Sequence, residues 1–173
     1  NGIEVEKNKV RKVHTSLGTV ETETVVNACG PWSAFFGKEI GFEIPVSPLR
    51  RQWFVTENIP ELPVEFPFVI DFSKSLYFHR EASGLLSGMS NQNQKIGADQ
   101  SIDQEWEMQH IEAAVARMPL LGNSGIKARQ AGLYELTPDA HPIIGPTPVE
   151  GFHLLTGFSG HGFMQGPICG KLM

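Results

Sequence analysis

The chain has 173 residues, of which 40% are hydrophobic and 19% charged, and this composition excludes a disordered tail, a collagen-like repeat and a coiled coil. Its formal net charge is −5, from 14 basic and 19 acidic residues without blocks of like charge, so we expect no nucleic-acid partner and no anionic-membrane surface. No apolar run approaches the roughly 20 residues that a membrane span needs, which leaves a globular protein that acts on a small molecule.

The cysteines and histidines give no sign of a disulfide framework or a metal site. Cys29 and Cys169 lie far apart, and no two of the six histidines form an HxH or an i, i+4 pair, so no metal is predicted. We expect Cys29 to be a small core residue rather than a nucleophile, and the setting to be reducing and cytoplasmic. The opening Asn1-Gly2-Ile3-Glu4 resembles neither an initiator nor a signal peptide, so we expect the chain to begin inside a longer protein.

The first third of the chain predicts a hairpin that leads into a strand, a turn and a short helix. Apolar and polar residues alternate over 3–15 and 19–28, on either side of a Ser-Leu-Gly turn, which is typical of paired β-strands. The second arm ends in an apolar run that leads directly to Gly30, and a short helix is expected around 34–36. Gly41 is expected to end that helix.

The middle of the chain predicts an antiparallel meander followed by one long helix. A helix is predicted over 102–118, because Ser101 and Gln104 match a capping box and apolar side chains recur at helical spacing up to Pro119. Turn residues separate the candidate strands. The expected strands are 52–56, 68–72, 76–79, 85–89, 127–136 and 152–156.

Two glycine-containing turns follow buried strands and are the first candidates for a ligand site. Gly157, Gly160 and Gly162 precede an expected helix, where missing side chains let backbone N–H groups face a ligand. Gly30 follows the apolar run 24–28 in the same way. Because the spacing is not that of the G-x-G-x-x-G dinucleotide fingerprint, an ordinary strand-to-helix turn remains the alternative.

A few polar side chains are candidates for contact with a small molecule. Arg50 and Arg51 suit a carboxylate, and at most one of them points inward because adjacent strand residues face opposite sides. Tyr77 and Tyr134 are either polar handles of an apolar pocket or core residues. His161 is either a polar contact or proton carrier among the glycines or a structural residue.

Four sequence segments keep one order along the chain and span nearly all of it. They are VVNACGPWS (25–33), PVSPLRRQ (45–52), AGLYELTPDAHPIIG (131–145) and TGFSGHGF (156–163). Together they resemble the FAD-dependent D-amino-acid oxidase superfamily, and within it the sarcosine oxidase and dimethylglycine dehydrogenase branch.

The resemblance implies an α+β fold of two domains. An antiparallel-sheet substrate-binding domain with helix 102–118 would cover 45–128. Residues 1–44 and 129–173 would form carboxy-terminal parts of a Rossmann-like FAD-binding domain that lacks its first βαβ unit. The missing amino-terminal FAD-binding segment is thus an expected partner.

The resemblance also implies roles for particular residues. Tyr134, Tyr77 and His161 would act in catalysis, while Arg51 and Met164 would contact the substrate. The helix that opens after the second glycine turn would direct its dipole at the reduced flavin. The implied cofactor-binding residues are Gly30, Ile144, Gly145, Gly157, Phe158, Ser159, Gly160, His161, Gly162 and Phe163.

Three positions depart from the family pattern. Gly132 stands where monomeric sarcosine oxidases carry the cysteine that links the flavin, which implies non-covalent FAD at this position. Leu86 aligns loosely with their lysine that promotes reaction with oxygen, which favours a dehydrogenase over an oxidase. Met164 replaces a lysine that binds the substrate carboxylate, so the carboxylate partner stays unidentified.

The implied activity is oxidation of the C–N bond of a small secondary or tertiary amine or amino acid, by hydride transfer to flavin N5. The alternative is a non-catalytic subunit that keeps the flavin fold for binding or assembly, which the missing lysines motivate. The chain by itself is expected to retain little FAD, to be inactive, and to self-associate through the apolar face that the missing segment would cover.

Overall fold

The computed structural model describes residues 2–173, which form two compact units. Unit 1 takes in the described residues up to Leu49 together with Ile96–Ala98 and Tyr134–Met173, and unit 2 consists of Arg50–Lys95 and Asp99–Leu133. Each unit has its own cluster of buried apolar side chains. Residues distant in the sequence therefore meet within each unit.

Unit 1 opens with a three-stranded antiparallel sheet in the order β1-β2-β3. The prediction of one long arm over 3–15 is wrong, because the chain turns at Lys7 and Asn8, whose φ angles are +48° and +63°. Asparagine adopts this left-handed conformation more readily than most residues, and such turns match the twist of paired strands. The strands are β1 (Gly2–Glu6), β2 (Lys9–Thr15) and β3 (Gly18–Glu21).

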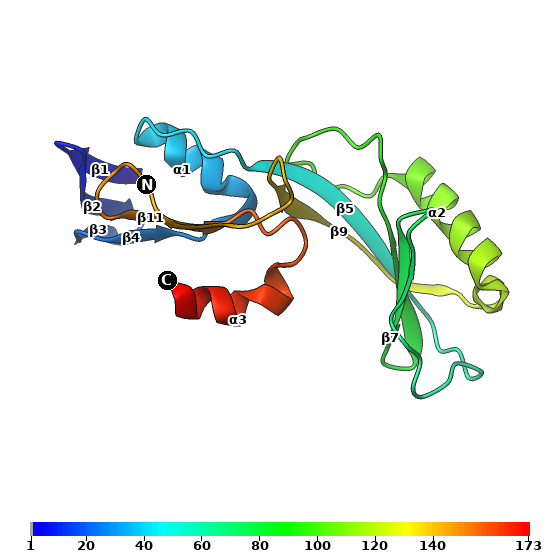
Figure 1. Ribbon diagram of the computed structural model, residues 1–173. Helices are drawn as coiled ribbons and strands as arrows, with labels where there is room; N and C mark the ends of the chain where they lie inside the picture. The colour runs from blue at the N-terminus through cyan, green and yellow to red at the C-terminus, as the bar shows by residue number, and fades with distance from the viewer. Residues whose placement is uncertain (1) are drawn as a thin grey trace. The chain divides into compact units, whose positions relative to one another are not determined.

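A second three-stranded sheet of unit 1 has the order β10-β11-β4. Strand β11 pairs parallel with β4 and antiparallel with β10, and its Phe152 and Leu154 belong to the core of the unit. Helices α1 and α3 lie on opposite sides of this sheet (Figure 1). The elements are β4 (Val25–Asn27), the 3-10 helix η1 (Gly30–Trp32), α1 (Ser33–Glu39), β10 (Ile143–Pro146), β11 (Phe152–Thr156) and α3 (Gly162–Leu172).

Unit 2 is built on a five-stranded sheet in the order β6-β7-β8-β5-β9. Strands β6, β7 and β8 form an antiparallel meander, which confirms the prediction, and β8 pairs antiparallel with β5. Helix α2 lies along one face of the sheet (Figure 1), where Leu76, Phe78 and Leu85 are at most 2% exposed. The elements are β5 (Ser47–Thr56), β6 (Val69–Asp71), β7 (Leu76–Glu81), β8 (Gly84–Met89), α2 (Gln104–Arg117), the 3-10 helix η2 (Pro119–Asn123) and β9 (Ile126–Leu136).

Helix α2 is capped by Asp103 rather than by the predicted Ser101. The Asp103 carboxylate accepts a hydrogen bond from the backbone N–H of Trp106 at 3.0 Å. Ser101 instead donates to Asp99, both from its backbone N–H and from its hydroxyl. The helix predicted over 102–118 is confirmed, but its predicted cap is wrong because the helix begins at Gln104, which makes Asp103 the residue that precedes its first turn.

The two units combine helices with mostly antiparallel sheets, which confirms the predicted α+β class. Over residues 2–173, none of the helices has both the length and the apolar content that crossing a membrane demands.

Candidate functional site

Two glycine turns lie at one edge of the β10-β11-β4 sheet. Strands β4 and β11 are parallel neighbours, with Asn27 opposite Leu154, so their carboxyl ends point the same way. Gly30 follows β4 with a φ of +54°, and Gly157 follows β11 with a φ of +79°. In open α/β sheets, ligands bind outside the carboxyl ends of the strands. The structure therefore brings both turns to the edge at which this architecture binds ligands.

The turn between β11 and α3 presents backbone to solvent. Gly157, Ser159 and Gly160 have positive φ angles, of +79°, +52° and +100°. Phe158 and Ser159 are buried and anchor the turn, whereas Gly160 and His161 are exposed. The first N–H groups of α3 have no acceptor within the helix, so they remain available as donors at this place.

A buried chain of polar side chains connects the two turns. Asn27, at the end of β4, donates through Nδ2 to the carbonyl oxygen of Ser33 at 3.0 Å and accepts at Oδ1 from the N–H of Cys29. The hydroxyl of Ser33 lies 2.7 Å from Oγ1 of Thr156, the last residue of β11. These three side chains belong to residues at most 2% exposed: Asn27, Ser33 and Thr156. Burying polar groups costs little when they are hydrogen-bonded to one another. These hydrogen bonds therefore fix the start of α1 against the end of β11.

The carboxylate of Glu135 joins this chain from β9. Its Oε2 accepts hydrogen bonds from Oγ1 of Thr156 at 2.9 Å and from the backbone N–H of Gly157 at 3.0 Å. A Cβ atom added to Gly30 would lie 3.5 Å from the same oxygen. Glu135 therefore reaches both turns at once.

Sequence reasoning missed all four members of this polar chain. The Ser33–Thr156 contact joins residues 123 positions apart, and no local pattern records such a contact. Two of them could have been noticed in the sequence, because Asn27 and Thr156 are polar residues at the ends of apolar runs, just before a glycine turn. The four residues are Asn27, Ser33, Glu135 and Thr156.

The two tyrosines singled out from the sequence each lie against a glycine. In unit 1, a Cβ atom on Gly160 would overlap the ring of Tyr134, and in unit 2 a Cβ atom on Gly88 would overlap the ring of Tyr77. In unit 2, the ring of Phe68 also stacks on that of Tyr77, with a centroid distance of 5.8 Å. Both tyrosine rings are thus held in place by their immediate surroundings.

The adjacent Arg50 and Arg51 face opposite sides of the unit 2 sheet. Arg50 lies on the α2 side and forms ion pairs with Asp99 at 2.9 Å and Asp103 at 3.3 Å. Its guanidinium therefore holds the segment before α2. Strand pairing from β5 through β8 to β7 places Arg51 on the same face of the sheet as Tyr77.

The other predicted site residues lie on β10 and at the start of α3. Ile144 and Gly145 belong to β10, the neighbour of β11. His161 precedes α3 as its N-cap residue and makes no capping hydrogen bond with its side chain. Phe163 is 102% exposed and Met164 is 74% exposed. The first turn of α3 thus carries bare apolar side chains.

Gly132 and Leu86, the two unit 2 residues compared with family positions from the sequence, carry neither a nucleophile nor a charge. Gly132 lies in β9, and a Cβ atom added there would meet no atom of the described residues within 4 Å. Leu86 lies in β8 opposite Val55.

Cys29 is exposed, so the prediction that it is a core residue is wrong. It stands between β4 and Gly30, where the chain leaves the sheet for the turn, and there it is only partly covered. Partial burial raises the pKa of its thiol above the usual range, which disfavours the nucleophilic thiolate.

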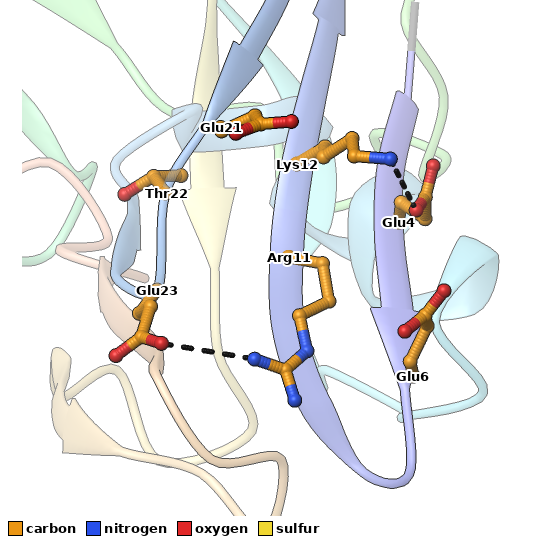
Figure 2. Close-up of a pocket in the computed structure, with 7 residues that line it drawn as sticks. All are labelled: Glu4, Glu6, Arg11, Lys12, Glu21, Thr22 and Glu23. Atoms are coloured by element: carbon orange, nitrogen blue, oxygen red, sulfur yellow. Dashed lines mark ion pairs between the residues drawn. The ribbon is translucent and has the colours of Figure 1, made fainter.

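A shallow hollow of about 380 Å³ on the β1-β2-β3 sheet is lined largely by charged side chains (Figure 2). Lys12 pairs with Glu4 at 3.1 Å, and Arg11 pairs with Glu23 at 3.7 Å (Figure 2). The hydrogen bond from Lys12 is the main cause that lowers the pKa of Glu4. These partly exposed pairs lie on a solvated sheet face, where the glutamates outnumber the two basic residues, Arg11 and Lys12.

The fold and the glycine turns define an α+β protein with two backbone turns at the carboxyl edge of one sheet. The chain belongs to the FAD dependent oxidoreductase family named DAO, whose model matches residues 1–173. This membership confirms the family resemblance of the sequence segments, and FAD is the cofactor of the family.

Relatives support the same assignment. The chain is 33% identical to human sarcosine dehydrogenase, mitochondrial, over 94% of its own length and 19% of that protein. It is 30% identical to mouse dimethylglycine dehydrogenase, mitochondrial, over 93% of its length and 21% of that protein. The crystal structure of L-proline dehydrogenase from P. horikoshii matches with a TM-score of 0.91 and 29% identity, covering 99% of this chain and 46% of that one. The chain thus spans about a fifth of these curated relatives and just under half of the solved structure.

Proposed function

We propose that the whole protein containing this chain oxidises the C–N bond of a small secondary or tertiary amine or amino acid. The observation that carries the proposal is the pair of glycine turns, joined by buried polar side chains, in a chain of the FAD-dependent family. The names of the relatives support this substrate class, since they act on sarcosine, dimethylglycine and proline.

The exposed backbone of the second glycine turn fits a flavin. A flat ring approaches a protein most closely over exposed backbone, and Gly160, which packs against the ring of Tyr134, is exposed beside the buried Ser159. The free N–H groups and the dipole at the start of α3 favour negative charge there. Bound FAD supplies the acceptor for the hydride that leaves the substrate carbon. Gly30, Ile144, Gly145 and residues 157–163 are the proposed contacts of its ring.

The chain's own residues would orient the substrate and exclude water. Hydride removal next to an amine needs an aligned C–H bond and a dry site more than it needs a strong acid or base. Tyr134 and Tyr77, whose rings are held in place, are proposed as substrate contacts. Arg51 is the proposed partner of a substrate carboxylate, Met164 a proposed apolar contact, and His161 a proposed polar contact.

Two departures shape the proposed reaction further. With Gly132 at the position of the linking cysteine, the flavin is non-covalent at that place. With Leu86 in place of the lysine that promotes reaction with oxygen, an electron acceptor other than oxygen is favoured. Both statements rest on the family resemblance and on the small or aliphatic side chains at these positions.

A second candidate function is a non-catalytic flavin-fold subunit that serves in binding or assembly. The observation that favours it is the loss of both family lysines, at Leu86 and Met164. Bleaching of a bound flavin by sarcosine, proline or dimethylglycine would exclude this alternative.

The 173-residue chain by itself is proposed to retain little FAD and to have no turnover, because it spans less than half of a solved relative. Four apolar side chains of α3, from Phe163, Met164, Ile168 and Leu172, are more than half exposed. Such a bare face favours self-association, which size-exclusion chromatography over a concentration series measures. Cys29 and Cys169 are free, and the reducing, cytoplasmic setting stays a prediction.

The test is an anaerobic titration of the whole protein with N-methylated and cyclic amino acids, followed through the visible flavin spectrum. Loss of the oxidised flavin band with one compound identifies the reaction and its substrate together. Admission of air then separates an oxidase from a dehydrogenase. A band that no compound bleaches argues for the non-catalytic alternative.

A further inference from the structure

We propose that Glu135 is the positioning residue that makes the two glycine turns into one preformed cofactor platform, and that its negative charge lowers the reduction potential of the flavin bound there. This inference rests on the proposed function, because it concerns the same edge of the β10-β11-β4 sheet.

Glu135 holds the second glycine turn at two points. Its side-chain Oε2 accepts from the N–H of Gly157 at 3.0 Å, and its backbone carbonyl accepts from the N–H of Ser159 at 3.2 Å. These bonds bracket the buried Phe158. The peptide groups of the turn are thereby fixed from β9, and the turn does not depend on a ligand for its shape.

The hydrogen bonds of the polar chain run in one direction, towards the carboxylate. Thr156 has one hydroxyl proton to donate. Its Oγ1 lies 2.9 Å from Oε2 of Glu135 and 3.3 Å from the carbonyl oxygen of Gly30, so the shorter hydrogen bond goes to Glu135. Because Thr156 donates its hydroxyl hydrogen bond to Glu135, its Oγ1 accepts a hydrogen bond from the hydroxyl of Ser33 at 2.7 Å. The chain of hydrogen bonds therefore ends at the Glu135 carboxylate, which accepts one hydrogen bond from Thr156 and one from Gly157.

Two different properties of Glu135 follow from this geometry. Its oxygen provides the acceptor for Thr156 and Gly157, which the side-chain oxygen of a glutamine also provides. Its charge is a separate property, which only a carboxylate provides. A negative charge close to a ring that gains electrons makes its reduction harder, and the charge of Glu135 would act against the favourable effect of the α3 dipole on a flavin held at these turns.

The experiment compares the whole protein with its Glu135→Ala and Glu135→Gln variants, and with Glu43→Gln as a matched loss of one exposed carboxylate. FAD affinity is measured by flavin fluorescence, the midpoint potential by spectroelectrochemistry, and protection of residues 156–159 by amide hydrogen exchange. Circular dichroism checks that each variant is folded.

We expect Glu135→Ala to weaken FAD binding by roughly tenfold or more and to increase exchange at Gly157 and Ser159, because the acceptor is lost. Glu135→Gln should bind FAD within about twofold of wild type, as two hydrogen bonds of similar geometry remain, but its midpoint potential should move to more positive values. Glu43→Gln should match wild type in all three measurements.

Wild-type FAD affinity in Glu135→Ala, or an unchanged potential in Glu135→Gln, would overturn the inference. If Glu135→Ala does not fold, the potential of Glu135→Gln still decides. A wild-type protein that binds no flavin overturns both this inference and the proposed function. A flavin that depends on Glu135 as described, but that no amine reduces, leaves the inference standing and overturns the proposed reaction.

Discussion

The carboxyl edge of the β10-β11-β4 sheet and the core beneath α2 both contain buried polar side chains, but they use them differently. At the sheet edge, Thr156 belongs to a chain of hydrogen bonds that ends beside exposed backbone. Beneath α2, Ser87 and His110 form a single pair, 2.8 Å apart, enclosed by apolar side chains. The connected side chains fix two turns at the edge of a sheet, whereas the enclosed pair completes the packing of a core.

The largest effect should come from truncating the core of unit 2. Phe78 is 2% exposed, so Phe78→Ala should lower the free energy of unfolding by about 3–5 kcal/mol, since a cavity replaces a buried ring. Urea unfolding measures this change. Phe72→Ala, at a phenylalanine of unit 2 that is 85% exposed, serves as the control and should unfold like the wild type. Equal losses in the two variants would contradict the assignment of the core.

The enclosed His110 should make unit 2 sensitive to acid. Burial lowers the pKa of His110 from 6.5 to about 4, so the unfolded chain takes up a proton at a higher pH than the folded chain does. Stability should therefore fall as the pH drops from about 6.5 to about 4, with a loss of about 3 kcal/mol at pH 4.

The test of this pH dependence is urea unfolding of wild type and His110→Gln between pH 7.5 and pH 4. The variant keeps a polar group near Ser87 but loses the titration, so the difference between the two curves isolates His110. Parallel curves over this range would show that His110 takes up its proton equally in the folded and unfolded states.

A smaller loss is expected at the polar chain of the sheet edge. Thr156→Val keeps the shape of the residue but removes the hydroxyl between Ser33 and Glu135, which should cost about 1–3 kcal/mol. Thr156→Ser restores the hydroxyl and should recover most of the loss. Thermal unfolding of both variants tests this, and a serine variant no better than valine would show that the methyl group matters instead.

The smallest effect is expected on the charged face of the β1-β2-β3 sheet. Lys12→Ala removes the partly exposed ion pair with Glu4, and such pairs contribute little because water and salt screen them. The melting temperature should stay within the error of the wild type. A clear drop in the melting temperature would mean that solvent screens the Lys12–Glu4 pair less than its partial exposure indicates.

Local signals in the sequence predicted most of the strands and helices. The apolar runs at 85–89 and 152–156 became β8 and β11, and the spacing of apolar residues up to Pro119 predicted α2. These features depend on residues that are neighbours in the chain. The turn at Lys7 and Asn8 was not predicted, because it lacks the glycine that is the clearest sequence mark of such a turn.

The candidate site was only half predictable. The glycines of both turns stand out in the sequence, because each follows an apolar run. The parallel pairing of β4 with β11, and the hydrogen bonds of Glu135, depend on contacts between distant segments. Neither has a local pattern that would distinguish it from an ordinary strand end.

The two tyrosine–glycine contacts look alike but should respond differently to paired substitutions. Gly88 has no positive φ, and the nearest atoms that an alanine there would meet belong to the ring of Tyr77, so a smaller residue at position 77 should restore folding. Gly160 has a φ of +100°, so alanine is strained whatever stands at position 134. A double-mutant cycle should therefore find strong coupling between positions 77 and 88 and incomplete rescue between 134 and 160. At positions 77 and 88, a larger side chain on one residue can be compensated by a smaller one on the other. At positions 134 and 160, the left-handed backbone of Gly160 adds a constraint that no change at position 134 removes.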